Sequence, residues 1–387
     1  MDPGRTVLAV SALMLGALAG AAEPPKAGGP AAGKFAPNPE LKALPEQAVK
    51  VLVPGGGYKA DANVLDYSGM VYDHHRHKIL AFGGGHATAR FPNSVHEFDP
   101  ATLKWTALTE DVPPAAYTAE NSVRTKDGQK LGGVKWAGKI WAGSRHTYDG
   151  LNLLPDADLM VSAQAQEFQS TACPAGYREN YQGGGGLWIF DPVKREWSVS
   201  EKDGLALSYC ISEISPKAPD WIYMWSSDLG GNQAVNWKTG ETKKVRDLPN
   251  KSMGYAGVTW CPETGTFWCF PAKKAWEYDP QADAWKTHPV KGEVPNTYDV
   301  NPVWDPVAGV FGLFSGGKFH YFSTAELTWH GLAAELDKDL DNGPMRHHHV
   351  YDPVDNVHLA VSGRWKTLAF KFMDKPGSLP GTTQPKN

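Results

Sequence analysis

The sequence predicts an all-β protein built from repeated antiparallel units, and three observations support this fold class. The chain of 387 residues contains 41 glycines and 30 prolines, so many turns are expected. It also contains 15 tryptophans, 14 tyrosines and 14 phenylalanines, residues that favour strands. No long segment keeps the hydrophobic period of an α-helix.

The start of the chain predicts export. Arg5 precedes an apolar core at 7–18, and small residues follow it, so we expect a signal peptide over residues 1–21. Residues 22–45 are rich in Pro, Ala and Gly and predict a flexible leader, and 376–387 predict a flexible tail. Because no apolar run is long enough for a membrane span, we expect a secreted or periplasmic protein.

Two kinds of unit recur along the rest of the chain. The first is "GMVYDHHRHKILAFGGG" (69–85), which returns as "PVWDPVAGVFGLFSGG" (302–317) and "HVYDPVDNVHLAVSG" (349–363). Each is a strand, an Asp-Pro-like turn, a strand and a stop of small residues. The second is typified by "VHEFDPATLKWTAL" (95–108), with a tight turn and a tryptophan. One unit of each kind gives four antiparallel strands, the content of one propeller blade.

Paired glycines followed by an aromatic-x-x-Asp-Pro and a later tryptophan resemble kelch repeats. The resemblance implies an all-β, kelch-type β-propeller over residues 46–375. We expect six blades, at 66–108, 144–200, 207–248, 252–289, 298–333 and 346–372. Gln47–Gly55 would complete the last blade and close the ring, whereas the unassigned Glu110–Gly143 keeps seven blades possible. We interpret Gly83–Gly85 as the turn that ends a repeat unit, since a dinucleotide-binding loop would need a helix after them.

Other recurring residues have structural interpretations. The tryptophans at 105, 197, 285 and 329 are expected to pack between blades. Cys261 and Cys269 could bridge one hairpin, leaving Cys173 and Cys210 as a second pair, or all four could be free thiols. We expect His74, His75 and His77 to be solvated, and His347–His349 not to chelate a metal because strand residues alternate in direction.

Polar residues gather where the first strands of the blades begin, and this position predicts a common rim. The ends of the second strands reach the same rim, as does the insertion at 166–186, so a concave ligand site is expected there. The candidate catalytic residues are His86, His146, Tyr209, Tyr255 and His348. The candidate substrate-binding residues are Tyr67, Arg145, Arg178, Tyr181, Asn301 and Arg346.

The composition and the rim residues favour a carbohydrate partner. A net charge of −4 argues against nucleic-acid binding. Our leading hypothesis is a polysaccharide lyase acting on a uronic-acid glycan, with His and Tyr as base and acid and Arg neutralising the carboxylate. This is similar in outline to exported propeller lyases such as ulvan lyases. Alternatives are a non-catalytic glycan- or protein-binding propeller and a sugar mutarotase or epimerase.

A resemblance to the central domain of galactose oxidase would imply a copper radical site. Only part of that ligand set can be recognised here, so we expect no metal and no other cofactor. The expected partner is an acidic polysaccharide or oligosaccharide. We expect a monomer, because a closed ring leaves no sheet edge to pair.

Overall fold

The structure is a computed structural model, and it describes most of the chain. The described residues are 34–60, 62–65, 67–84, 91–165, 176–181, 183–226, 232–250, 256–271, 273–297, 300–332, 348–377 and 379–380. Within them the protein is all-β, with several four-stranded antiparallel sheets. This arrangement is consistent with a propeller.

The first three repeats form one sheet each. The first sheet contains β2 (Gly69–Asp73), β3 (Lys78–Phe82), β4 (His96–Asp99) and β5 (Lys104–Ala107). The second contains β9 (Leu151–Leu153), β10 (Met160–Ser162), β11 (Trp188–Asp191) and β12 (Glu196–Val199). The third contains β13 (Cys210–Ile214), β14 (Trp221–Ser226), β15 (Gln233–Asn236) and β16 (Thr242–Lys244).

The later repeats continue this pattern. The fourth sheet contains β17 (Val258–Cys261), β18 (Thr266–Cys269), β19 (Lys274–Asp279) and β20 (Ala284–Pro289). The fifth contains β22 (Val303–Asp305), β23 (Val310–Ser315), β24 (Lys318–Ser323), β25 (Thr328–Gly331) and the short parallel β21 (Lys291–Gly292). The last contains β26 (His349–Asp352), β27 (Val357–Ser362), β28 (Lys366–Phe370) and β1 (Val49–Val53).

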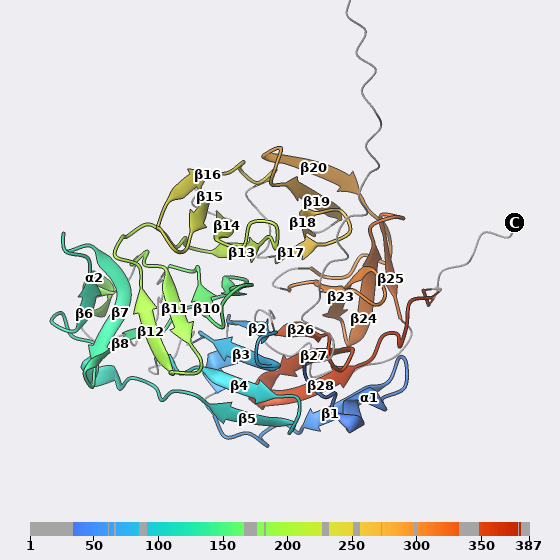
Figure 1. Ribbon diagram of the computed structural model, residues 1–387, viewed down its shortest axis with the longest axis horizontal. Helices are drawn as coiled ribbons and strands as arrows, with labels where there is room; N and C mark the ends of the chain where they lie inside the picture. The colour runs from blue at the N-terminus through green and yellow to red at the C-terminus, as the bar shows by residue number, and fades with distance from the viewer. Residues whose placement is uncertain are drawn as a thin grey trace, which may run out of the picture.

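The sheets are arranged around a common centre (Figure 1). The first strand of each sheet faces this centre and contacts the first strand of the next, in the order β2, β9, β13, β17, β22 and β26. β26 also contacts β2, so the first and last sheets are neighbours. Residues that precede these inner strands are therefore brought together from distant parts of the sequence.

Aspartates shape the turns between paired strands, as the repeat predicted. The carboxylate of Asp305 accepts the backbone N–H groups of Val307 and Ala308 at 2.9 and 3.0 Å. Asp191, Asp279 and Asp352 make the same kind of contact. Because the side chain satisfies turn N–H groups locally, these hairpins can be recognised from sequence.

The recurring tryptophans pack between neighbouring sheets, which confirms that prediction. Trp105 contacts Trp365 of the last sheet with ring centroids 4.9 Å apart, and Trp197 contacts Phe82 of the first sheet at 4.7 Å. Trp285 lies 5.3 Å from Trp225, and Trp329 lies 5.2 Å from Phe270. Such contacts bury large apolar areas at each junction and supply much of the core.

The segment at 110–143, which sequence left unassigned, forms a separate three-stranded sheet. It contains β6 (Ser122–Arg124), β7 (Lys130–Trp136) and β8 (Lys139–Ala142), preceded by the 3₁₀ turn η2 (Pro114–Ala116). β8 lies against β12, the outer strand of the second sheet. Figure 1 accordingly shows this small sheet at the periphery, away from the centre.

Residues 34–45, the described part of the leader that we predicted over residues 22–45, contain a short helix. Asn38 caps the short helix α1 (Pro39–Lys42), and Leu41 is fully buried. Beyond it, β1 pairs antiparallel with β28. The 3₁₀ turns η1 (Ala62–Leu65) and η4 (Gly363–Trp365) also contact each other. A few packed apolar residues thus give this segment defined structure, although its Pro-, Ala- and Gly-rich composition predicted flexibility.

The proposed Cys261–Cys269 disulfide is absent. Both thiols are buried and free, because Cys261 pairs with Thr266 and Cys269 pairs with Val258 in the hairpin register. The two cysteines are therefore staggered along the strands beyond the reach of an S–S bond. Cys210 is buried, and Cys173, its suggested partner, lies outside the described residues. In the described residues, no helix has the length and apolarity that crossing a membrane requires.

Removing β1 should destabilise the protein. A variant beginning at residue 54 exposes the edge of β28 and the apolar surface that α1 and β1 cover, so we expect the Tm to fall by about 5 °C or more. The control begins at residue 34 and keeps both elements. Differential scanning calorimetry measures the effect, and equal Tm values for the two variants would show that β1 contributes nothing to stability.

Candidate functional site

Three tyrosines stand directly before or near the beginnings of inner strands in an unusual backbone conformation. Tyr67, Tyr148 and Tyr209 have φ values of 56°, 42° and 49°. This left-handed region is costly for bulky residues and is kept only where the surroundings enforce it. The three residues belong to the first, second and third repeats, and each lies one to three residues before the inner strand of its sheet.

Together with His146, these tyrosines form one group, which we call the tyrosine–histidine cluster. The Tyr67 ring stacks on His146 with centroids 4.7 Å apart, and Tyr148 lies 6.2 Å from Tyr67 and 6.0 Å from Tyr209. Nδ1 of His146 is 3.1 Å from the Tyr148 hydroxyl. His146 and Tyr148 are buried, whereas Tyr67 and Tyr209 are half-buried.

His348 joins the same rim through the first sheet. Its Nε2 lies 2.9 Å from Oγ of Ser68, the neighbour of Tyr67. Burial lowers the pKa of His348 to about 4, so the imidazole is neutral at physiological pH. Neutral His348 therefore serves as a hydrogen-bonding partner rather than as a cation.

Asp149, which sequence reasoning missed, follows Tyr148 of the cluster and connects four of the repeats by hydrogen bonds. Asn301 Nδ2 donates to its Oδ1 at 2.7 Å, and the Val258 N–H donates to its Oδ2 at 2.7 Å. The Asp149 carbonyl accepts the Ser212 N–H at 3.1 Å. A residue of the second repeat thus bonds to the third, fourth and fifth. Asn301, predicted to bind substrate, is a partner of this carboxyl group.

Gly83 packs against Thr147, and the space at this position admits no side chain. The Thr147 hydroxyl donates to the Phe82 carbonyl at 2.8 Å and accepts the Gly69 N–H at 2.8 Å. A Cβ on Gly83, whose φ is 120°, would lie 2.7 Å from the Thr147 hydroxyl oxygen. The glycine stop therefore permits "SRHTYDG" (144–150) to dock on the first sheet.

Arg145 was predicted to neutralise a substrate carboxylate, but it points into the protein. Its guanidinium is fully buried and donates to the carbonyls of Gly143 and Gln164 at 3.0 and 2.9 Å, and also to that of Gly132. Three of its N–H groups are thus used on backbone carbonyls. Arg145 thus fastens the β6–β8 sheet to the second sheet and does not face the rim.

The end of the insertion at 166–186 also differs from the prediction. Its helix α2 (Tyr177–Asn180) lies beside β6 and β7 at the periphery (Figure 1). Tyr181 is buried, and its hydroxyl donates to the Thr118 carbonyl at 2.5 Å. This hydrogen bond fixes Tyr181 in a core with Tyr117. Arg178 belongs to α2, and its side chain lies outside the described part of the structure.

Three further candidates lie outside the described residues: His86, Tyr255 and Arg346. Of the remaining candidates, Tyr67 and His146 are in direct contact, and Tyr209 is linked to them through Tyr148. His348 and Asn301 are connected to the same region through Ser68 and Asp149. Tyr148 and Asp149 are the additions from the structure. The signal for them was the density of polar and aromatic residues in "SRHTYDG", where a buried strand start would normally be apolar.

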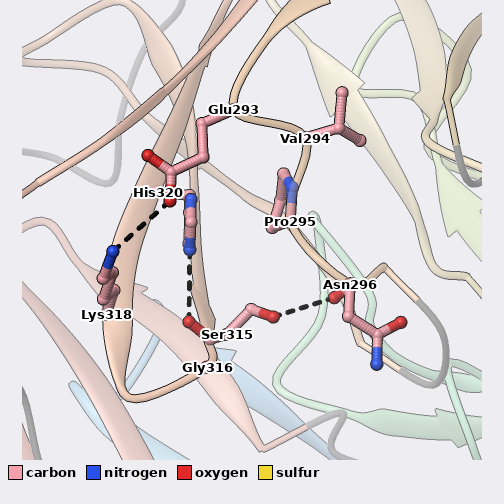
Figure 2. A pocket seen from close by; sticks show the side chains of 8 residues that line it. All are labelled: Glu293, Val294, Pro295, Asn296, Ser315, Gly316, Lys318 and His320. Atoms are coloured by element: carbon pink, nitrogen blue, oxygen red, sulfur yellow. Dashed lines mark hydrogen bonds and ion pairs between the residues drawn. The ribbon is translucent and has the colours of Figure 1, made fainter.

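A separate shallow pocket lies beside the fifth sheet (Figure 2). It has a volume of about 480 Å³ and is lined by Glu293, Val294, Pro295, Asn296, Ser315, Gly316, Lys318 and His320. Lys318 faces Glu293 at 3.4 Å, and the Ser315 hydroxyl donates to the Asn296 carbonyl at 3.0 Å. None of the predicted site residues lines this pocket.

The comparisons with known proteins identify no family. No known family matches the sequence, and no curated protein matches it. Similar solved structures include auxiliary nutrient binding proteins from Bacteroides thetaiotaomicron (10% identity, TM-score 0.48) and Bacteroides ovatus (11%, 0.46), each covering 83% of this chain and 75% of that chain. A chain of a mitotic checkpoint complex has 11% identity and a TM-score of 0.46, covering 85% of this chain and 94% of that one. These likenesses assign no function.

Stability should depend on pH because the carboxyl groups of buried Asp149 and half-buried Glu213 have raised pKa values. Burial raises the pKa of Glu213 from 4.5 to about 7 and raises that of Asp149 well above its usual range. A group with a raised folded-state pKa stabilises the fold at low pH, and this contribution is lost as pH rises through the folded-state pKa. For Glu213 we expect the free energy of unfolding to fall by up to about 3 kcal/mol between pH 4.5 and 7.

Urea denaturation across this pH range measures the effect. Glu213→Gln removes one titrating group, so the pH-dependent loss should become smaller in the variant. Identical pH profiles for the wild type and the variant would contradict this assignment.

Proposed function

We propose that this chain is an exported carbohydrate-binding propeller, with six blades closed by β1, and that its ligand binds at the tyrosine–histidine cluster. The observation that carries the proposal is the convergence of Tyr67, Tyr148 and Tyr209, all with left-handed backbones, around His146. The sequence of residues 1–21 supports export, and the order of inner-strand contacts supports six blades around one centre.

The chemistry of the cluster suits a sugar. Aromatic rings offer apolar faces on which the C–H faces of a pyranose can stack, while hydroxyl and imidazole groups offer hydrogen bonds. Tyr67 and Tyr209 are half-buried, and their rings contact those of the buried His146 and Tyr148. Because packing fixes these side chains before binding, little conformational entropy would be lost when a ligand is bound.

The second candidate is the uronic-acid lyase, and one contact favours it. His146 Nδ1 and the Tyr148 hydroxyl are 3.1 Å apart, a suitable pair for exchanging a proton with a substrate. A lyase also needs a cation for the substrate carboxylate. Arg145 is committed to backbone carbonyls and does not supply it. Arg346 and the Arg178 side chain, the other candidate cations, lie outside the described residues, so we rank binding above catalysis on the aromatic contacts of the cluster.

Substitution of the two half-buried tyrosines tests the binding proposal. We expect Tyr67→Ala and Tyr209→Ala each to weaken oligosaccharide binding at least tenfold, about 1.4 kcal/mol, because each removes a stacking face. A panel of neutral and uronic-acid oligosaccharides is screened first, and isothermal titration then gives Kd. The matched control is Trp237→Ala, which removes a half-buried aromatic residue that follows β15, at the end of the third sheet remote from Tyr209.

Two outcomes would contradict the proposal. One is the absence of binding to every glycan by folded wild-type protein, and the other is an equal loss of affinity in Trp237→Ala. The same glycans are also monitored for unsaturated products. Product formation that disappears in Tyr148→Phe would favour the lyase over the binding protein.

A further inference from the structure

A buried histidine and two buried aspartates meet where the first and last sheets adjoin. His77 ends the turn between β2 and β3, Asp352 ends β26, and Asp355 lies in the turn that follows β26. The side chains are 3%, 0% and 0% exposed, respectively. His77 was expected to be solvated; instead, its left-handed backbone, with φ of 56°, accompanies a ring that lies inside the protein.

The hydrogen bonds of this group are incomplete. Nε2 of His77 lies 3.0 Å from Asp352 Oδ2 and 3.5 Å from Asp355 Oδ2. One N–H cannot serve both carboxylate oxygens well, and Asp355 Oδ2 has no hydrogen-bond partner within the described residues. A buried oxygen of this kind costs free energy unless something else satisfies it.

The charges are also unbalanced. Two carboxylates meet at most one imidazolium, so the group keeps a net negative charge when both aspartates are ionised. Arg76, the neighbouring cation, is already paired with Asp73, Glu97 and Asp158. A buried charge without compensation is strongly unfavourable, and a bound cation would remove the imbalance.

The geometry suits a divalent transition-metal ion. The three ligand atoms all lie within 4.8 Å of one another. Ligands bound tetrahedrally to Zn²⁺ at 2.0–2.2 Å are about 3.4 Å apart, close to the spacing of His77 from the two aspartates. The imidazole nitrogen favours an ion of the zinc type over Ca²⁺ or Mg²⁺, which prefer oxygen ligands.

The remaining atoms of the aspartates are held by the backbone. Asp352 Oδ1 accepts the N–H of Val354 at 2.9 Å, and Asp355 Oδ1 accepts the N–H of Asn38 at 2.6 Å. These bonds orient the two Oδ2 atoms toward His77, as outer contacts orient ligands in metal sites. They also connect the group to the N-terminal segment that leads into β1.

We propose that His77, Asp352 and Asp355 bind one structural Zn²⁺ ion that joins the first sheet, the last sheet and the N-terminal segment. The ion would replace a single shared N–H by three ligand bonds. It would thereby secure the junction at which the two ends of the repeat array meet, away from the tyrosine–histidine cluster.

Metal analysis of the full chain tests this proposal. We expect about one zinc ion per chain in protein purified without chelators. After EDTA treatment and dialysis, added Zn²⁺ should raise the Tm by about 5 °C or more, whereas Ca²⁺ and Mg²⁺ should not. Another transition ion bound at one per chain would retain the site but replace zinc as its occupant. No bound transition metal, with no response of the Tm to Zn²⁺, would overturn the proposal.

Asp355→Asn distinguishes a metal site from an ion pair, because the two predict changes of opposite direction in the Tm. If zinc is bound, losing a carboxylate ligand lowers both the zinc content and the Tm. If the group is only an ion pair, removing the surplus negative charge leaves the Tm unchanged or raises it, and the proposal fails.

The matched control is His358→Gln. It disrupts a buried His–Asp contact of 3.2 Å with Asp305 that involves one aspartate only. Its zinc content should equal that of the wild type, even if its Tm falls. Loss of zinc in this control as well would contradict the assignment to His77, Asp352 and Asp355.

Discussion

The candidate site depends on the hydrogen bonds that Asp149 accepts. Side-chain and main-chain oxygens of this one residue accept hydrogen bonds from Ser212, Val258 and Asn301, which belong to three other repeats. Contacts between neighbouring sheets are largely aromatic packing, which leaves some freedom of position. A buried carboxyl group with directional bonds has little such freedom, so the beginnings of these inner strands are held in one arrangement.

This arrangement explains why strained tyrosines are tolerated. Tyr148 directly precedes Asp149, and Thr147 on its other side is bonded to the first sheet. Because both neighbours are fixed, Tyr148 is held in the left-handed backbone conformation. Its ring contacts those of His146 and Tyr209. The strain is compensated by bonds elsewhere and yields a rigid aromatic surface.

Much of the fold was predictable because its signals are local. The aspartate turns and repeated tryptophans marked the sheets, and alignment of the repeats placed Tyr67, His146 and Tyr209 at one rim. Arg145 was misjudged because a buried arginine that binds carbonyls resembles a ligand-binding arginine in sequence. Asp149 and His77 both lie in or near turns, where a polar residue is expected for local reasons alone. Their roles depend on partners more than 100 residues away, which no local pattern reveals.

A crystal structure of the protein with a bound oligosaccharide tests the central claim most directly, since it locates the ligand without assuming any residue's role. The account predicts a sugar ring stacked on Tyr67 or Tyr209, with His146 and Tyr148 in the same positions as in the free protein. A sugar bound in the pocket of Glu293 and Lys318, with the tyrosine–histidine cluster unoccupied, would contradict it.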